Sequence, residues 1–310
     1  MAGLQQLNWD SEGVGSKAAA LVDLSTVAGN KISNPPWVKF QSAGWVNFPS
    51  APTPIPDKGS PIAYQDLSFG DMNVGDLVVE LTGDAKRSRH FAHLDPDLRA
   101  DSLPRSPGWK PLLGQMGSAQ GHLRKQGVQA GDVFLFFGSF RPVEQTAEGW
   151  RFKRAERARH IIWGWMQIGR IHKVDELPSD EMHWARYHPH FAYSPDASNT
   201  LYESTDQLVV GGAHTHALGS GVFTNFDERL VLTAPESNAQ TSWRLPSFLA
   251  PVDGRSQLSY HGDARRWRIV GDECLLNSVA RGQEFVFDTQ GQDAPIQWIL
   301  SLLESIPSSN

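Results

Sequence analysis

Cysteine is almost absent from this sequence, since Cys274 is the single one among 310 residues. One cysteine permits no intrachain disulfide, no cysteine-based zinc site and no Cys-x-x-Cys redox centre. It also excludes the Pro-Cys-x-x-Cys half of the zinc-deaminase signature. These absences favour a reducing compartment, and Cys274 itself, in the segment DECLLN, is predicted to be a small buried hydrophobe.

Long apolar runs and nucleophile motifs are missing as well. No run of eighteen apolar residues occurs, and the opening MAGLQQLNWDSEG has neither the basic start nor the apolar centre of a secretory signal. We therefore expect a cytoplasmic protein without membrane attachment. The nucleophile elbow of serine hydrolases and the Gly-Lys-Ser/Thr phosphate loop are also absent, which argues against both of those hydrolytic chemistries.

Charge is distributed unevenly along the chain. The net charge is −6, yet residues 86–173 hold sixteen Lys and Arg against seven Asp and Glu. A locally positive segment attracts phosphate-bearing ligands even when the whole chain is acidic. The same composition also fits solvated side chains spread over several faces, because clustering in sequence is a weak indicator of clustering in space.

The pattern of apolar residues predicts an α+β protein built on a mixed or antiparallel sheet. Residues 133–140 and 160–174 are apolar at successive positions, which is typical of central strands covered on both faces. A short helix is predicted over residues 118–127, with Ser118 as candidate N-cap, and residues 294–306 have the apolar spacing of a closing helix. Shorter strands are predicted at residues 74–83, 207–212, 221–226, 228–234, 267–270 and 284–288.

The segment RHFAHLDPDLR places His93, Asp95 and Asp97 at alternate positions. In an extended conformation, which Pro96 favours at the preceding residue, these three side chains share one face. One face with an imidazole and two carboxylates suits a Zn, Mn or Fe ion, or an acid/base pair. The alternative is structural, because Asp-Pro is common in turns and Asp97 is a good cap for a following turn.

Two further segments carry candidate binding residues. In GQMGSAQGHLR, glycines precede a helix start whose backbone N–H groups suit a phosphate or carboxylate, although the same glycines serve equally to shape a turn. His-x-His pairs occur at His188 and His190 and at His214 and His216. Such pairs hold metals when both rings lie on one face, and they are also common in loops that bind nothing.

A series of sequence blocks resembles one known family. In chain order the blocks are HLDPDLR, GQMGSAQGHLRKQGVQAGDVFLFFGSFR, IIWGWMQIGRI, HPHF, NTLY, GSGVF, SWRLPSFLAP, LSYH and RGQEFVFD. Together they resemble the third family of nucleotide-modification-associated domains, found in bacteria and their phages and inferred to take part in hypermodification of DNA bases. The resemblance covers about residues 54–290. The front departs from the family's usual Arg-Lys-Gly-Phe-Asp-Ser, because QLNWDS keeps Asp10 and Ser11 but lacks the basic pair.

The resemblance implies a single large domain over residues 1–310. Residues 1–53 would be an atypical N-terminal extension, 54–290 the family-like core and 291–310 a closing helix and tail. A fainter resemblance, of GDVFLFFGSF and IIWGWMQIGRI to PUA-like proteins, implies a small β-barrel around residues 126–175, with Trp163 and Trp165 as candidate walls of a base slot. Aromatic residues in apolar strands are more often core residues, which is the alternative.

The family resemblance also implies that the chain binds a nucleotide or DNA base and modifies it, with phage defence as a setting. The candidate catalytic residues are His93, Asp95, Asp97 and His122, and the candidate ligand or phosphate-binding residues are Arg89, Arg99, Gln115, Ser118, Gln120, Arg124, Trp163, Trp165 and His190. A divalent metal is the candidate cofactor. Two alternatives remain: a non-catalytic PUA-like reader of a modified base, and a small-molecule enzyme of nucleotide-sugar or purine metabolism.

Overall fold

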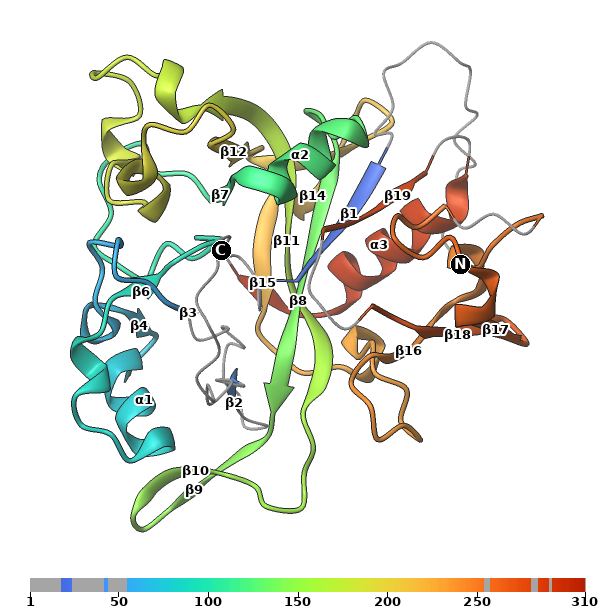
Figure 1. The fold of residues 1–310 in the computed structure, drawn as a ribbon, viewed down its shortest axis with the longest axis horizontal. Coiled ribbons are helices and arrows are strands. Elements are labelled where there is room, and N and C mark those ends of the chain that lie inside the picture. The colour runs from blue at the N-terminus through green and yellow to red at the C-terminus, as the bar shows by residue number, and fades with distance from the viewer. Residues whose placement is uncertain are drawn as a thin grey trace, which may run out of the picture.

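The computed structural model describes residues 18–23, 42–43, 55–253, 257–279, 284–289 and 292–309. The largest sheet of this described part has nine strands and curls into a half-barrel (Figure 1). Its main path is β19 (Glu284–Asp288), β1 (Ala18–Asp23), β8 (Val133–Arg141), β11 (Arg159–Lys173), β12 (Thr200–Ser204) and β7 (Leu112–Gln115). Three more strands join it, β15 (Ser220–Phe223) beside β11, β2 (Ser42–Ala43) beside β8 and β20 (Ser308–Ser309) beside β15. Most pairs are antiparallel, and β1 and β2 run parallel to β8.

Smaller elements surround this sheet. The α-helices of the described part are α1 (Val74–Thr82), α2 (Gly117–Lys125) and α3 (Asp293–Ser305). The smaller sheets pair β3 (Ile55–Pro56) with β6 (Ala92–His93), β4 (Ser68–Phe69) with β5 (Met72–Asn73), β9 (Val143–Thr146) with β10 (Gly149–Phe152), β13 (Gln207–Val210) with β14 (Ala213–Leu218), and β18 (Glu273–Asn277) with β16 (Ser242–Pro246) and β17 (Trp267–Val270). Short 3-10 helices are η2 (Tyr64–Asp66), η3 (Arg87–Arg89), η4 (Val174–Glu176), η5 (His183–Ala185), η6 (Pro189–Tyr193), η7 (Glu228–Leu230), η8 (Ser247–Leu249) and η9 (Ala264–Arg266).

The strands β8 and β11 separate two hydrophobic cores. Phe134 and Phe136 of β8 belong to a buried cluster that includes Leu123 of α2. The alternate residues of β8 belong to a second cluster that includes Leu302 of α3. Since successive side chains of a strand point to opposite faces, α2 and α3 cover opposite sides of the sheet (Figure 1). The prediction that both strands are central is confirmed, and coverage of both faces holds for β8 and for β11 up to Ile168, whereas Arg170 and Ile171 are exposed.

The curl of the sheet comes from the length of β11. One edge of this 15-residue strand pairs with β8, while the other pairs first with β15 and then with β12. Register shifts after Ile162 and after Ile168 accompany the change of partner. Among the described strands, β19 and β7 at the two ends of the path are not paired with each other. The sheet is therefore a half-barrel, and the closed barrel expected around residues 126–175 is not confirmed.

Two strand predictions are wrong. Residues 74–82 form α1, because the Asn73 side chain accepts a hydrogen bond from the backbone N–H of Asp76 and Gly83 ends the helix at φ +69°. The valines of this segment suggested a strand, yet Val74, Leu77 and Val78 are buried at helical spacing. Residues 228–234 form η7 and isolated bridges rather than a strand. The helices α2 and α3 are confirmed, although α2 takes Met116 as its N-cap instead of Ser118.

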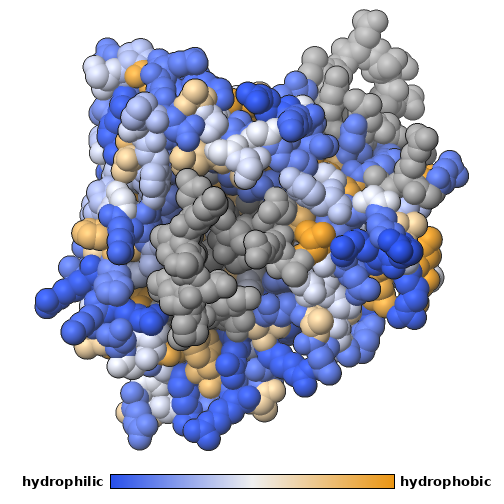
Figure 2. Space-filling view, viewed as in Figure 1, coloured by the Kyte–Doolittle hydropathy of each residue, from blue (hydrophilic) through white to orange (hydrophobic). Residues whose placement is uncertain are grey.

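Cys274, membrane attachment, the surface and the N-terminal segment are the remaining features to compare with the sequence. Cys274 is fully buried, as predicted. Within the described residues, no helix combines the length and apolar character needed to span a membrane. Figure 2 shows a mostly hydrophilic face, with an apolar patch at the edge where β17 lies in Figure 1 and where Ile269 and Val270 are exposed. The departure from the family at Asp10 and Ser11 lies outside the described residues.

We expect the aromatic core on the α3 side to supply much of the folding stability. The Phe137 ring is 1% exposed and lies 5.1 Å from the Trp243 ring and 6.2 Å from the Phe285 ring. Phe137→Ala should lower the free energy of unfolding by about 3–5 kcal/mol in urea titrations. The control Ile269→Ala, at a side chain 64% exposed, should change it by less than about 0.5 kcal/mol. Equal effects of the two substitutions would contradict this assignment of the core.

Candidate functional site

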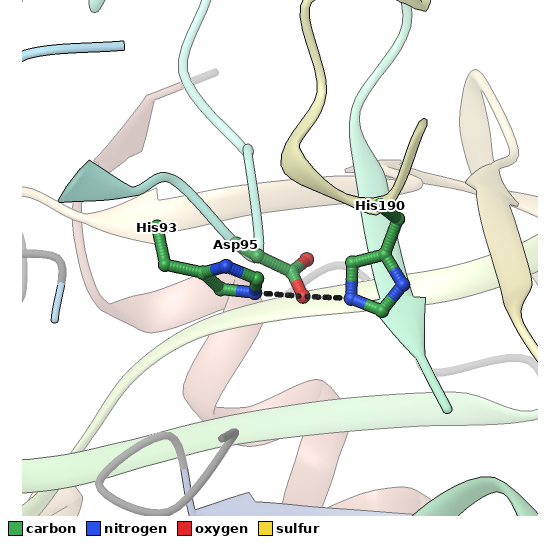
Figure 3. Close-up of side chains that lie close together, drawn as sticks. All are labelled: His93, Asp95 and His190. Atoms are coloured by element: carbon green, nitrogen blue, oxygen red, sulfur yellow. Dashed lines mark ion pairs between the residues drawn. The ribbon is translucent and has the colours of Figure 1, made fainter. Parts of the chain in front are cut away.

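The candidate site lies where β6 and the segment after it meet η6 and the end of β7. We call the four side chains His93, Asp95, His188 and His190 the histidine–aspartate cluster. All four residues are buried, and the side chain of Asp95 is fully so. His93 ends β6, Asp95 follows two residues later before a cis peptide bond to Pro96, and His190 lies in η6. Figure 3 shows the two imidazoles of His93 and His190 directed at the carboxylate of Asp95.

One end of His93 is fixed by a second carboxylate. Its Nδ1 lies 2.8 Å from Oδ2 of Asp57. The other oxygen of Asp57 accepts hydrogen bonds from the Tyr193 hydroxyl and the Gly59 backbone N–H. An ionised carboxylate only accepts hydrogen bonds, so Nδ1 of His93 carries a proton and donates it to Asp57. The Nε2 atom of His93 is thereby directed toward Asp95, 3.6 Å from its Oδ2.

His190 is oriented in the same way by an amide. Its Nδ1 lies 2.6 Å from Oδ1 of Asn199. The Asn199 Nδ2 donates to the backbone carbonyl of His190 at 2.8 Å, which fixes the orientation of this amide. Nδ1 of His190 is therefore the donor, and its Nε2 faces Asp95 Oδ2 at 3.4 Å.

The two oxygens of Asp95 have different surroundings. Oδ1 accepts a hydrogen bond of 2.8 Å from the backbone N–H of Gly114 in β7. Oδ2 faces the Nε2 atoms of His93 and His190 at distances longer than a charge-assisted hydrogen bond. All three of these atoms are buried and have no hydrogen-bond partner within the described part of the chain. One donor atom from each of the three residues lies within 4.8 Å of the other two.

His188 differs from the other two histidines. Its Nδ1 accepts a hydrogen bond from the backbone N–H of His190 at 3.4 Å, so a neutral His188 carries its proton on Nε2. That Nε2 lies 3.5 Å from Oδ1 of Asp95, the oxygen that Gly114 also contacts. Burial lowers the pKa of His188, which favours the neutral ring. The Nε2–H of a neutral His188 is therefore directed toward Oδ1 of Asp95, at a distance too long for a hydrogen bond.

Burial and contacts oppose each other in the electrostatics of the cluster. Burial disfavours the charge of Asp95, but its contacts with His188, His190 and His93 hold its pKa well below the usual range. Burial also disfavours a charged His93, and its hydrogen bond to Asp57 and its proximity to Asp95 outweigh this effect, raising the pKa of His93 to about 9. Hydrogen bonds from His93, Tyr193 and Gly59 lower the pKa of Asp57 to about 2, although burial opposes this shift. The cluster is therefore built around two ionised carboxylates.

Asp97 is held by another set of residues. Arg105 donates to both of its oxygens, at 2.6 and 2.7 Å, and the Tyr187 hydroxyl donates to Oδ2. Trp109 donates its indole N–H to the Tyr187 hydroxyl, and the Arg105 guanidinium lies 4.3 Å from the Trp109 ring centroid. The expectation that His93, Asp95 and Asp97 converge is met for the first two only. Both oxygens of Asp97 already have protein partners.

His122 and the residues expected to bind phosphate lie apart from the cluster or on its margins. His122 bonds to Ser259 at 3.0 Å and stacks on the Tyr260 ring. Gln120 accepts from the Tyr202 hydroxyl, and Arg99 is paired with Asp101. Gln115, one residue after Gly114, is buried with both side-chain polar atoms unpaired within the described residues, while Arg89, Ser118 and Arg124 are exposed.

The tryptophans expected to form a base slot lie in the core. Trp163 is 3% exposed and belongs to the cluster on the α2 side, and Trp165 is 1% exposed and belongs to the cluster on the α3 side. The two rings therefore lie on opposite faces of the sheet, and a slot with both as walls does not form.

Three residues of the site have no role in the sequence-based hypothesis. Asp57 and Tyr193 carried no recognisable signal, because their contacts with each other and with His93 span 136 and 36 positions of the chain. Asn199 lies in the block NTLY, which contributed to the family resemblance but indicated no role for Asn199 itself.

Gly114 is required by the packing of His190 on β7. A Cβ atom placed on Gly114 would overlap the imidazole ring of His190. Gly114→Ala should therefore displace His190 and lower the free energy of unfolding by about 1–3 kcal/mol in urea titrations. Gly121→Ala in α2 is the matched control, because its Cβ meets open space and should stabilise the helix by up to about 1 kcal/mol. A Gly114→Ala protein as stable as the parent would show that His190 does not pack there.

The comparison with known proteins concerns most of the chain. The family model described as nucleotide modification associated domain 3 matches residues 49–288, a span that contains the whole histidine–aspartate cluster and its partners. No curated protein and no solved structure matches the chain. Because the match covers well over half of the sequence, the chain belongs to the family of nucleotide modification associated domain 3.

Proposed function

We propose that this protein binds a nucleotide or a DNA base and modifies it at the histidine–aspartate cluster. Membership of a nucleotide-modification-associated family supplies the class of substrate. The cluster supplies reactive groups, since two imidazoles and a carboxylate face one another without hydrogen-bond partners among the described residues. Groups of this kind transfer protons or hold a catalytic cation in many enzymes.

The observation that carries the proposal is the convergence of separate family-like blocks on Asp95. HLDPDLR contributes His93 and Asp95, HPHF contributes His188 and His190, and NTLY contributes Asn199. GQMGSAQ begins at Gly114, whose N–H bonds to Asp95. Blocks that are far apart in the sequence thus meet around one carboxylate, as expected of a reaction centre.

The start of α2 is the proposed place for the phosphate of the substrate. β7 leads from Gly114 through Met116 directly into α2, where the Gly117 N–H already donates to Ser198 Oγ at 2.7 Å and the next N–H groups carry the partial positive charge of a helix N-terminus. Ser118 is exposed in the first turn of this helix, whereas Arg124 is exposed in its last turn and lies away from this end.

The alternatives from the sequence receive less support. A PUA-like reader needs an open aromatic slot, and Trp163 and Trp165 are both buried in the core. A small-molecule enzyme of nucleotide metabolism would use the same cluster on a free nucleotide. DNA affinity that falls steeply with added salt would favour polynucleotide binding over this alternative.

Mass spectrometry of nucleosides tests the proposal directly. Cells with this gene should contain a modified nucleoside that cells without it lack. Asp95→Asn and His190→Ala should each reduce its formation by at least about a hundredfold, the usual contribution of a positioned acid, base or ligand. Asp206→Asn, at a carboxylate 83% exposed, and His90→Ala, at an exposed histidine three residues before His93, should leave it unchanged.

Two results would decide against this function. Identical nucleoside profiles with and without the gene would remove base modification from consideration. A profile that depends on the gene but is unaffected by folded Asp95→Asn and His190→Ala proteins would place the reaction elsewhere in the chain.

A further inference from the structure

We propose that His93, Asp95 and His190 bind one divalent transition-metal ion. The ligand atoms would be Nε2 of His93, Oδ2 of Asp95 and Nε2 of His190. The inference deepens the proposed function and rests on it only for the role of the metal in the reaction. The metal site itself follows from the geometry of the cluster, so metal binding and base modification can fail separately.

The first argument concerns the lone pairs. Asp57 and Asn199 each accept a hydrogen bond from Nδ1, one from His93 and the other from His190. Metal binding would displace any proton from Nε2 of His93; with the remaining proton held on Nδ1, the Nε2 atom of each imidazole presents a lone pair toward Oδ2 of Asp95. Metal-binding histidines commonly donate their other ring N–H to a carboxylate or amide oxygen, which fixes the ring and its tautomer. Both histidines have this arrangement.

The second argument concerns the distances. Oδ2 of Asp95 lies 3.6 Å from Nε2 of His93 and 3.4 Å from Nε2 of His190. Direct hydrogen bonds from doubly protonated imidazoles to the carboxylate would bring these atoms to about 2.7–2.9 Å. Around a tetrahedral ion with ligands at about 2.0–2.2 Å, neighbouring ligand atoms are separated by about 3.4 Å. The distance from Oδ2 of Asp95 to each of the two Nε2 atoms therefore matches the separation of neighbouring ligand atoms around one ion.

The third argument concerns what else could occupy the centre. A second proton on His93 gives an ion pair with Asp95, but it leaves Nε2 of His190 facing the same carboxylate oxygen without a proton between them. Two buried acceptors in that position destabilise the fold unless a cation or proton separates them. One metal ion satisfies Oδ2 and both Nε2 atoms together.

The donor set limits the choice of ion. Two imidazoles and one carboxylate suit Zn, Fe(II) and Mn, whereas Mg and Ca prefer ligand sets made of oxygen alone. His188 is kept outside the ligand set, because its Nε2 proton is directed at the other oxygen of Asp95. Three protein ligands leave at least one coordination position open, which is the arrangement of catalytic rather than structural sites.

Metal titration of the full-length protein tests the site without any knowledge of the substrate. Protein freed of metal by a chelator should bind one Co(II) per chain and acquire visible absorption bands, and Zn(II) should displace the Co(II). Asp95→Ala and His190→Ala should each weaken Co(II) binding by at least about a hundredfold. Asn199→Ala should weaken it about 10–100-fold, because it removes only the hydrogen bond that orients His190.

The controls separate binding from folding. His90→Ala and His216→Ala remove exposed histidines and should keep the parent affinity, which shows that surface imidazoles do not account for the signal. Circular dichroism and urea titration confirm that each variant is folded before its affinity is used. The parent protein provides the decisive measurement if a ligand variant fails to fold.

Either of two outcomes would overturn the metal site. A folded parent protein that takes up no Co(II) or Zn(II) would show that the cluster is a proton-linked ion pair. Undiminished Co(II) binding in folded Asp95→Ala and His190→Ala proteins would place the metal elsewhere. Metal binding without any gene-dependent nucleoside would retain the site and remove the proposed function, whereas modification by metal-free protein would retain the function and remove only the role of the metal in the reaction.

Discussion

A carboxylate removed from water loses a large hydration free energy, and the side chain of Asp95 is fully buried. The structure compensates this loss through groups from several parts of the chain: the Gly114 N–H from β7, the imidazole of His93 at the end of β6, and those of His188 and His190 at the start of η6. The partners of the histidines follow in turn, since Asp57 and Asn199 fix the two rings that face Oδ2. Position 114 requires glycine, because the His190 ring occupies the space that a side chain there would need.

The sheet supplies the rigid support for this arrangement. β7 and β12 pair in register from Leu112 to Gln115, and Asn199 precedes β12 directly. β7 at the end of the sheet and β12 beside it continue a sheet whose central pair, β8 and β11, is buried on both faces over most of its length. Closely packed strands permit little movement, so Gly114 and Asn199 hold their hydrogen-bond partners at fixed positions. The site thus depends on a core that lies beside it and contributes no reactive group.

Much of this support could be predicted from the sequence, and much of the site could not. The apolar runs gave β8 and β11 correctly, because a strand covered on both faces needs apolar residues at successive positions. The i, i+2 spacing brought His93 and Asp95 together, but it could not show that Asp97 would instead pair with Arg105 from a separate turn. The sequence did not predict the roles of Asp57, Asn199 and Tyr193, because the tertiary fold brings them to their partners. No local pattern encodes a contact such as that between Asp57 and His93, which lie 36 positions apart. The valine-rich α1 was misread because the caps Asn73 and Gly83 outweigh the strand preference of valine there.

The hydrogen bond from Tyr193 to Asp57 and the contact between His190 and Asp95 join the two ends of a segment that spans residues 57–193. A chain that has formed its helices and hairpins but not yet joined these ends would carry ordinary, solvated histidines. The cluster is therefore an internal reporter of the native topology. Histidine proton resonances, or any spectroscopic signal from a group bound there, would follow the completion of folding rather than the formation of secondary structure.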